Sequence, residues 1–259
     1  MKRVALLLGL FLLAAPSVSA QDWAKERLDK SPRHHDWVTL KAGDHTFKAF
    51  IAHPEVSKKA PAVLVIHENM GLMDWVRETA DEIASEGYIA IAPDLMGDKT
   101  YPSQDDARKA VASLDPNVVT DELNAAADYV EHLPSADGKL AVVGFCWGGG
   151  QSFRYATNNP HIKADFVFYG PPPSKEDLAR IKAPVYGFYG GNDNRITSTV
   201  DTTKQDMEAL HKTYEPQVYP DAGHAFMRKG DAPDAQAGEK AAREKAWDRF
   251  VALLKKTFK

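Results

Sequence analysis

The chain has 259 residues, of which 44% are hydrophobic, and a formal net charge of −4 at pH 7. A chain of this length makes one large or two small domains, and its apolar content is enough for a buried core. The excess of acidic residues provides no electrostatic basis for binding nucleic acid.

The first part of the chain, residues 1–20, has the composition of a secretory signal peptide. Lys2 and Arg3 precede an apolar run over residues 4–15, and small residues lead up to Ala20. This pattern predicts cleavage after Ala20 and a secreted or periplasmic protein with no stable membrane association after cleavage. The alternative is an uncleaved membrane anchor, but the run is shorter than the roughly 20 residues that a spanning helix needs.

The segment over residues 21–35 is polar and predicts a loosely held lead-in. No linker composition divides the rest of the chain, so residues 36–259 predict a single domain. Apolar and polar residues alternate over 37–40 and 45–52, on either side of Gly43, which predicts an antiparallel hairpin at the start of this domain.

Further strands and helices alternate along the remainder of the chain. Continuous apolar runs, typical of strands buried on both faces, predict strands over residues 62–66, 88–92, 140–144, 164–169 and 185–189, with a short last strand over 217–219. Apolar residues at helical spacing predict helices that end near residues 87, 134, 157 and 210, a short helix within 95–116 and a closing helix through 246–254. The alternation predicts an α/β fold, a mostly parallel central sheet with helices on both faces.

The only cysteine of the chain follows a predicted strand, in the pattern Gly144-Phe145-Cys146-Trp147-Gly148. In α/β-hydrolases the corresponding G-x-S-x-G forms a strained strand-to-helix turn that presents the nucleophile above the sheet. The alternative interpretation is a buried cysteine that packs as a small hydrophobic residue before a glycine-rich loop. Because the chain has no second cysteine, Cys146 makes no intrachain disulfide, and its thiol is inert, pairs between molecules or is reactive.

Polar residues follow the ends of the predicted strands, where the ligands and catalytic groups of such sheets gather. Glu68 and Asn69 follow the first buried strand, Cys146 follows the third, and Asp193 and His224 follow the last two. Nucleophile, acid and then histidine is the chain order of the α/β-hydrolase triad. Asp193 alone is compatible with a plain turn, and His224 is one of nine histidines. Together with Cys146, however, they predict a triad.

The predicted roles follow from the chemistry of a thiol nucleophile. His224 accepts the thiol proton or pairs with the thiolate, which is the effective nucleophile, and Asp193 fixes the imidazole tautomer. The helix that starts near Trp147 points its positive end at Cys146 and favours the thiolate. The backbone N–H groups of Trp147 and Asn69 are predicted to bind the developing oxyanion, and each contributes about 3 kcal/mol to the reduction of the barrier.

With these residues assembled, the chain resembles the dienelactone hydrolase family (carboxymethylenebutenolidase-like enzymes) of the α/β-hydrolase fold. The resemblance extends from about Gly43 to the closing helix, and a cysteine in place of serine is itself a feature of the family. The motifs that carry it are Val65-Ile66-His67-Glu68-Asn69-Met70-Gly71-Leu72, Arg77-Glu78-Thr79, Gly87-Tyr88, Ala92-Pro93-Asp94-Leu95, Gly144-Phe145-Cys146-Trp147-Gly148-Gly149, Asp193 and Gly223-His224-Ala225-Phe226.

The resemblance implies further roles for Glu68 and Arg228. The family glutamate that matches Glu68 contacts the resting thiol and takes part in activating it when substrate enters; the alternative is a helix cap or a carboxylate paired with Arg77. Arg228 matches a family arginine that holds the substrate carboxylate, and its alternative is a solvated surface arginine. No metal site is predicted here, because the H-E-x-x-H zinc pattern that His67 would begin fails at Gly71.

A second family arginine, shortly after the Pro-Asp-Leu motif, has no counterpart here, where Met96-Gly97-Asp98 stands instead. An acidic residue at this place is not expected to hold a carboxylate. Another small ester or lactone is therefore at least as well supported as dienelactone itself.

These observations predict an exported, monomeric hydrolase without a cofactor that cleaves small esters or lactones through a cysteinyl acyl-enzyme. One alternative is a catalytically silent α/β-hydrolase homologue that binds a ligand. Another is a redox thiol protein, although the chain offers neither a resolving cysteine nor a C-x-x-C motif.

Overall fold

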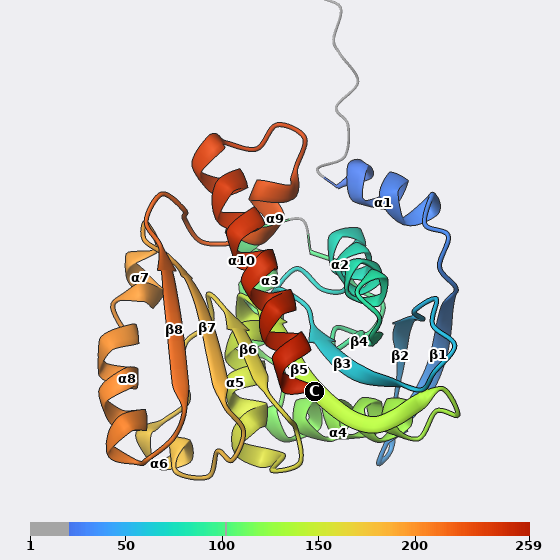
Figure 1. Cartoon of the computed structure of the whole chain (residues 1–259), viewed down its shortest axis with the longest axis horizontal. Coiled ribbons are helices and arrows are strands. Elements are labelled where there is room, and N and C mark those ends of the chain that lie inside the picture. The colour runs from blue at the N-terminus through green and yellow to red at the C-terminus, as the bar shows by residue number, and fades with distance from the viewer. Residues whose placement is uncertain (1–20, 102) are drawn as a thin grey trace, which may run out of the picture.

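The computed structural model describes residues 21–101 and 103–259, which form a central sheet flanked by helices (Figure 1). The strands of these residues lie in the order β1-β2-β4-β3-β5-β6-β7-β8. Their bounds are β1 His35–Ala42, β2 His45–Ala52, β3 Ala60–Ile66, β4 Ile89–Pro93, β5 Ala136–Phe145, β6 Asp165–Phe168, β7 Val185–Gly190 and β8 Tyr214–Tyr219. The signal peptide predicted for residues 1–20 lies outside the described part of the chain.

The sheet is mixed only at one edge. β1 and β2 form an antiparallel hairpin, and β2 pairs antiparallel with β4. All other neighbouring strands pair in parallel. The predicted α/β fold, with a mostly parallel sheet and an N-terminal hairpin, is confirmed, and every predicted strand overlaps an observed one. β5 begins earlier than predicted, at Ala136, because Asp137-Gly138-Lys139 separate this residue from the apolar run.

Helices pack on both faces because alternate side chains along a strand point to opposite sides of the sheet. In β3, Val63 and Val65 join one core, whereas Leu64 and Ile66 join the other. The first layer contains α1 Asp22–Asp29, α2 Asp74–Ser85, α9 Phe226–Asp231 and α10 Ala237–Thr257. The second layer contains α4 Pro116–Glu131, α5 Trp147–Asn158, α6 Lys175–Leu178, α7 Asn194–Thr197 and α8 Val200–Ala209.

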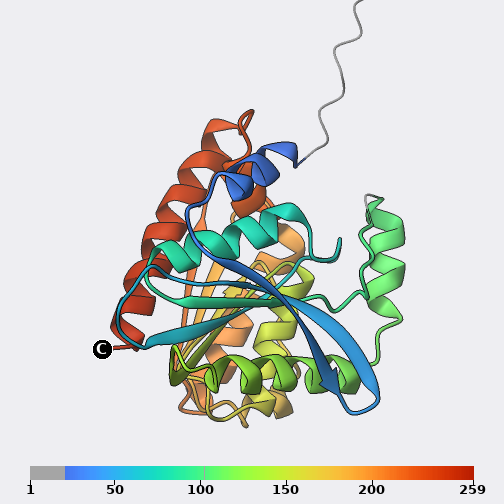
Figure 2. The same ribbon diagram turned by 90° about the vertical axis from the view of Figure 1, so that its right-hand side faces the viewer.

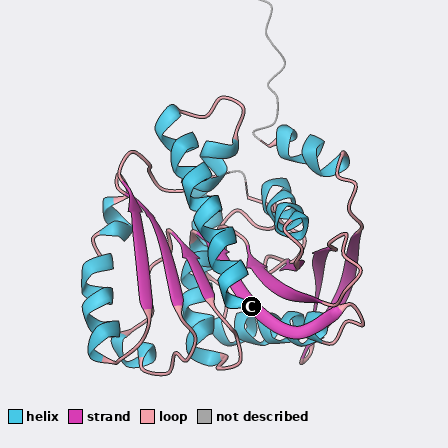
Figure 3. Ribbon diagram, viewed as in Figure 1, coloured by secondary structure: helices cyan, strands magenta, loops and turns pink. Residues whose placement is uncertain are grey.

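The layers and edges are visible in two views. In Figure 2, α1, α2 and α10 lie on one side of the strands and α4 on the other. Figure 3, with strands in magenta and helices in cyan, shows α6 and α8 beside the β7–β8 edge and the β1–β2 hairpin at the opposite edge. α3 Gln104–Ala112, the short helix predicted within 95–116, stands apart from both layers in Figure 2. Among the helices of residues 21–101 and 103–259, none combines the length and apolar composition of a membrane span.

The segment predicted as a loosely held lead-in, residues 21–35, contains helix α1 and is held against α2. Ala24 and Leu28 of α1 are buried in the same core as α2. Gln21, directly before the helix, accepts a hydrogen bond through Oε1 from the backbone N–H of Trp75 at 3.1 Å. The structure differs from the prediction because two apolar residues at helical spacing are too few to stand out in a polar sequence.

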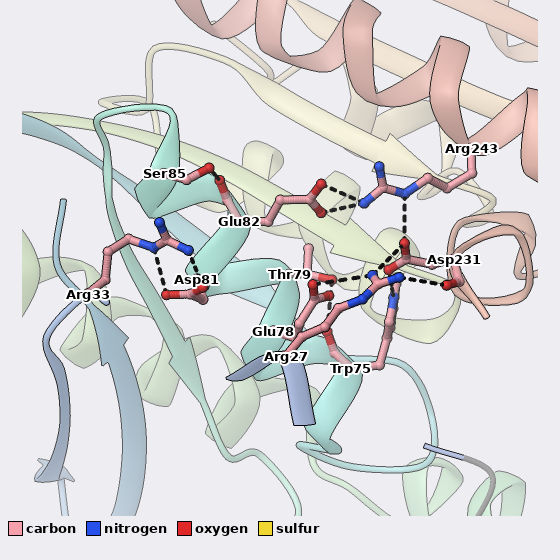
Figure 4. Close-up of polar contacts among 10 residues, drawn as sticks. All are labelled: Arg27, Arg33, Trp75, Glu78, Thr79, Asp81, Glu82, Ser85, Asp231 and Arg243. Carbon is pink, nitrogen blue, oxygen red and sulfur yellow. Dashed lines mark hydrogen bonds and ion pairs between the residues drawn. The ribbon is translucent and has the colours of Figure 1, made fainter. Parts of the chain in front are cut away.

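A cluster of charges, buried except for the half-exposed Arg27, joins α1, α2 and the α9–α10 segment (Figure 4). The carboxylate of Asp231 accepts hydrogen bonds from Arg27 Nη1 at 3.0 Å and Trp75 Nε1 at 3.3 Å, and it lies 3.3 Å from Arg243 Nε. Burial, followed by the charge of Asp231, raises the pKa of Glu78 in the same cluster to about 8. The cluster thereby anchors the end of α9 to α1, α2 and α10.

Candidate active site

Cys146 lies at the sharp turn between β5 and α5. Its backbone has a positive φ of 57° with ψ of −116°, a conformation that residues other than glycine rarely adopt. Strand and helix meet so closely that a Cβ on Gly144 would lie 2.0 Å from the carbonyl oxygen of Gly148. A Cβ on Gly148 would lie 2.3 Å from the carbonyl oxygen of His67. The turn therefore requires both glycines of the G-x-C-x-G pattern.

The structure brings together the sulfur of Cys146, the imidazole of His224 and the carboxylate of Asp193. His224 Nε2 lies 3.0 Å from Cys146 Sγ, and His224 Nδ1 lies 2.5 Å from Asp193 Oδ2. Asp193 follows β7 and is buried, whereas His224 follows β8 and is partly exposed. Because the Asp193 carboxylate accepts the proton on Nδ1, the lone pair of Nε2 is directed at the thiol.

Two backbone donors also act on the sulfur. The backbone N–H groups of Trp147 and Asn69 lower the pKa of the Cys146 thiol, and these are the two donors that the sequence predicts for an oxyanion hole. Trp147 is the first residue of α5, so the N-terminus of this helix is directed at the sulfur. Asn69 comes from the loop after β3. Fixed dipoles thus surround the place where negative charge would develop during attack by the thiol.

Despite these donors, the thiol stays protonated at neutral pH. Burial, and then the negative charge of Glu68, raise the pKa of Cys146 to about 12. The backbone donors and the charge of Arg195 act in the opposite direction but are outweighed. The protein therefore holds a thiol rather than a thiolate until the charges around the sulfur change.

Glu68 and Arg228 form an ion pair beside this thiol. Arg228 Nε donates to Glu68 Oε2 at 2.6 Å, and the side chain of Glu68 is only 5% exposed. The other carboxylate oxygen, Oε1, is buried and makes no hydrogen bond to any described residue. The alternative pairing of Glu68 with Arg77 is wrong, because Arg77 pairs with Asp74. Arg228 is also not a solvated surface arginine, since 24% of its side chain is exposed and its charge is engaged by Glu68.

A cavity of about 480 Å³ opens in front of the thiol. Besides the predicted residues, its lining includes Gln104 and Arg108 of α3, Tyr169 after β6 and Arg195 of α7. These four were not predicted, because their approach to the sulfur depends on how distant segments fold over the sheet edge. Of the four, only Arg195 could have been suspected from the sequence, since it lies two residues after Asp193.

Tyr169 is the most constrained of the unpredicted residues. It is fully buried, has a positive φ of 42°, and its hydroxyl makes no hydrogen bond within the described residues. Burial raises the pKa of Tyr169 well above its usual range, so the hydroxyl remains a neutral donor. Its ring packs edge-on against the imidazole of His224, with centroids 5.2 Å apart, and so limits the positions that the imidazole can take.

Asp98, which stands where the family has its second arginine, lies outside the cavity. Its carboxylate lies 2.9 Å from Lys48 Nζ on β2 and is 61% exposed, and it is not among the described residues that line the cavity. Its position outside the cavity follows from the turn after β4, which directs this side chain toward β2. Three arginines line the cavity instead, namely Arg108, Arg195 and Arg228.

His67, which begins the incomplete zinc pattern, connects the ends of two strands. Its Nδ1 lies 2.6 Å from the carbonyl oxygen of Glu68, and its Nε2 accepts the backbone N–H of Leu95 at 3.2 Å. Burial lowers the pKa of His67, so the ring is neutral and both contacts are satisfied by a single tautomer. Among the described residues, the clusters with metal-ligand spacing lie elsewhere.

The profile of the dienelactone hydrolase family matches residues 47–258. The chain belongs to this family. Over 224 residues it is 34% identical to an Escherichia coli (strain K12) protein named "Putative carboxymethylenebutenolidase", with 80% of this chain and 81% of that protein covered. A Bradyrhizobium sp protein named "Probable 2-oxo-3-(5-oxofuran-2-ylidene)propanoate lactonase" is 28% identical over 237 residues, covering 85% of this chain and 93% of that protein.

Solved structures agree with the family assignment. The "Putative Dienelactone Hydrolase from Klebsiella pneumoniae subsp. pneumoniae MGH 78578" superposes with a TM-score of 0.76 at 28% identity, covering 85% of this chain and 97% of that one. The α/β-hydrolase fold that the resemblance implies is thus confirmed. The chain is a dienelactone hydrolase-like hydrolase, an enzyme that acts on ester or lactone bonds.

We predict that Glu68→Gln makes Cys146 more reactive near neutral pH. The substitution removes the second-largest cause of the raised thiol pKa and leaves the charge of Arg228 unpaired beside the sulfur, and both effects favour the thiolate. Lowering the pKa by about one unit increases the thiolate fraction, and hence the rate of alkylation by iodoacetamide, about tenfold at slightly alkaline pH.

The measurement is the alkylation rate as a function of pH, with the modified residue located by mass spectrometry. Asp98→Asn removes an acid outside the cavity and is the matched control, whose profile should equal that of the unmodified protein. If the Glu68→Gln profile does not move to lower pH, burial alone sets the thiol pKa.

Proposed function

We propose that the enzyme hydrolyses small esters or lactones with Cys146 as nucleophile, His224 as general base and acid, and Asp193 as the group that orients the imidazole. One observation carries this proposal. An unbroken line of contacts runs from Cys146 Sγ to His224 Nε2 at 3.0 Å and from His224 Nδ1 to Asp193 Oδ2 at 2.5 Å. Membership of the family and the cavity in front of the sulfur support it.

In the first half of the reaction, His224 takes the thiol proton while the sulfur attacks the carbonyl carbon. The negative charge on the tetrahedral oxygen is stabilised by the backbone N–H groups of Trp147 and Asn69. Collapse of this intermediate breaks the ester C–O bond, and His224 gives its proton to the departing alkoxide. A cysteinyl acyl-enzyme remains, and with a lactone the new hydroxyl stays attached to the acyl group.

In the second half, His224 removes a proton from a water molecule, which attacks the thioester carbonyl. The same backbone donors stabilise the second oxyanion. Its collapse breaks the C–S bond, releases the carboxylic acid and returns the proton from His224 to the sulfur of Cys146. Asp193 keeps the imidazole in one tautomer through both halves and stabilises its protonated form.

Glu68 and Arg228 are proposed to control when the thiol becomes reactive. A substrate carboxylate that enters the cavity would compete with Glu68 for the guanidinium of Arg228. The released Glu68 carboxylate then takes part in activating the thiol, as the family resemblance implies, while His224 accepts the proton. Without substrate the sulfur stays protonated, and a protonated thiol resists oxidation better than a thiolate.

We predict that Cys146→Ala, His224→Ala and Asp193→Asn each lower kcat/KM for p-nitrophenyl acetate by about 10³-fold or more, because members of a triad act as a unit. The unmodified enzyme should release p-nitrophenol in a burst, and rapid quenching followed by mass spectrometry should find the acetyl group on Cys146. His161→Gln replaces an exposed histidine and serves as the control for unaffected turnover.

Activity retained by Cys146→Ala would overturn the assignment of the nucleophile. If the unmodified protein turned over nothing in a broad panel of esters and lactones yet bound a member of that panel tightly, the silent ligand-binding alternative would replace the enzyme proposal.

The charges around the cavity favour substrates that carry a carboxylate. Of the three arginines that line it, Arg108 pairs with Asp105 at 3.1 Å and Arg228 pairs with Glu68. Arg195 makes no ion pair within residues 21–101 and 103–259, so its charge is available to an incoming anion. The name of the Bradyrhizobium relative describes a substrate that is itself a carboxylate. We infer that Arg195 is the first group to receive the substrate anion.

We predict that Arg195→Gln raises KM about tenfold for a lactone that bears a free carboxylate, because one charge-assisted contact is lost. The same variant should leave KM for the neutral p-nitrophenyl acetate within a factor of about two. Arg195→Lys keeps the positive charge and should restore most of the affinity. Equal effects of Arg195→Gln on charged and neutral substrates would contradict the assigned role.

We also propose that the enzyme is exported and that residues 1–20 are removed. The support is the pattern of Lys2, Arg3, an apolar run and small residues up to Ala20. When the full chain is expressed in a bacterial host, the intact mass of the exported form should correspond to a first residue of Gln21. Ala20→Lys, which places a large charged residue at the cleavage site, should leave the precursor unprocessed. A chain that retains Met1 and stays in the cytoplasm would refute export.

A further inference from the structure

Three potential metal ligands meet at the open end of the β1–β2 hairpin, far along the sheet from the thiol. His34 directly precedes β1, Asp36 is the second residue of β1, and His53 directly follows β2. Because His35 pairs with Ala52, His34 lies opposite His53, and the backbone N–H of His53 donates to the carbonyl oxygen of His34 at 3.0 Å.

The pleat of the strand selects which side chains gather. His34 and Asp36 are two residues apart and therefore point to the same face, where His53 joins them. His35 points to the other face, where its Nε2 lies 2.8 Å from Asp81. The cluster is thus separate from the ion pairs that Asp81 makes with the preceding segment.

The side chains present their ligand atoms toward one another. His34 Nε2 lies 3.0 Å from Asp36 Oδ1, and His53 Nε2 lies 3.0 Å from Asp36 Oδ2. One ligand atom from each of the three residues lies within 4.8 Å of the others. The imidazole rings stand 5.4 Å apart at 35°, so neither ring blocks the space between the nitrogens.

We propose that His34, Asp36 and His53 bind a divalent transition-metal ion such as Zn²⁺. Zinc takes imidazole nitrogen and carboxylate oxygen at about 2.0–2.2 Å in a tetrahedron, which separates neighbouring ligands by roughly 3.3 Å. The observed N–O separations of 3.0 Å are within a small movement of that spacing. Two nitrogen ligands out of three select Zn²⁺, Cu²⁺ or Ni²⁺ over Mg²⁺ and Ca²⁺, which prefer oxygen.

Exposure determines how such an ion would be held. The side chain of His34 is 71% exposed and that of Asp36 45%, whereas His53 is 23% exposed. Solvent therefore reaches the cluster, and water completes the coordination. The guanidinium of Arg33, the residue directly before His34, is engaged by Asp81 at 2.5 Å rather than by Asp36.

A second cluster with metal-ligand spacing is less suited to a metal ion. Glu78 and Asp231 also lie within ligand distance of each other and of Glu82. There, however, Arg27 and Arg243 already pair with the carboxylates, so a cation would meet two fixed positive charges. The His34–Asp36–His53 cluster offers two neutral donors and one anion instead, which is the combination that a metal ion requires.

A metal at this place would join the segment that leads from α1 into β1 to the end of β2. These two segments meet at the open end of the hairpin, where the backbone hydrogen bond from His53 to His34 already joins them. A metal ion that binds only the folded chain would stabilise the folded state, and the stabilisation would increase with metal concentration. The inference is independent of the proposed catalytic mechanism, since no group of the cavity takes part.

The test is titration of the full metal-free chain with Zn²⁺ against a chromophoric chelator, together with Co²⁺ as a spectroscopic substitute. We expect one Zn²⁺ per chain at this site with a Kd in the micromolar range, visible d–d absorption with Co²⁺, and a Tm that rises with added Zn²⁺. His53→Gln and Asp36→Asn should each weaken binding at least about tenfold and abolish the rise in Tm. His132→Gln removes an exposed histidine that also lies beside an aspartate, Asp128, and should change nothing.

Because Cys146 and His224 could themselves take up zinc, the titration is repeated with Cys146→Ala. Retention of one Zn²⁺ in Cys146→Ala, and its loss when His53→Gln is added, supports the hairpin site. The proposal is overturned if binding disappears with Cys146→Ala, or if His53→Gln and Asp36→Asn bind Zn²⁺ as tightly as the unmodified chain.

Discussion

At Cys146 the chain keeps a positive φ, a conformation that costs about 1–3 kcal/mol and persists only where the surrounding structure holds it. Two backbone hydrogen bonds do so: the N–H of Cys146 donates to Phe168 at 3.0 Å, and its carbonyl accepts from Gly150 at 3.2 Å. Beneath the turn, Phe145, Phe168 and Phe188 pack in the buried sheet with centroids 4.9 and 4.1 Å apart. The position of the sulfur is therefore set by core packing, and the imidazole, the backbone donors and the cavity are all arranged around a fixed point.

Opposing electrostatic effects act on the proton of that sulfur. A rise of the thiol pKa from 9.0 to about 12 corresponds to roughly 4 kcal/mol against forming an isolated thiolate, and burial is its largest cause. Rearranging Glu68 alone removes only the smaller part of this cost. His224 removes much of the rest, because transfer of the proton to Nε2 creates an imidazolium 3.0 Å from the thiolate and buries no net charge. Asp193 then stabilises that imidazolium from the other side.

Local sequence patterns were sufficient to predict the strands of the sheet and to identify the polar residues that follow them. Buried parallel strands are continuous apolar runs, so the polar residues that follow them, such as Cys146, Asp193 and His224, could be identified by order alone. The partner of Glu68 could not be identified from the sequence, because Arg228 is 160 residues away and Arg77 is equally plausible. Helices α1, α6, α7 and α9 were also missed, because they are short and their few apolar residues make no clear helical repeat. The direction of Asp98, and the place of Arg195 in the cavity, depend on loop conformations that composition does not encode.

Helix α9 shows how the site depends on charges remote from the chemistry. A helix of six residues is not stable on its own, and α9 begins after Ala225, whose φ of 63° adds backbone strain directly beside His224. Near its start, Arg228 binds Glu68; at its end, Asp231 binds Arg27, Trp75 and Arg243 (Figure 4). Breaking the buried Arg228–Glu68 pair on one partner costs about 3–5 kcal/mol, which exceeds what so short a helix contributes by itself. The pair of Asp231 with the half-exposed Arg27 adds about 0–1 kcal/mol. The contacts at the two ends therefore hold α9 in place. Through α9 they fix both the guanidinium that pairs with Glu68 and the loop that carries the imidazole of His224. An N-terminal helix that touches no substrate thus contributes, through Arg27, to the geometry around the thiol.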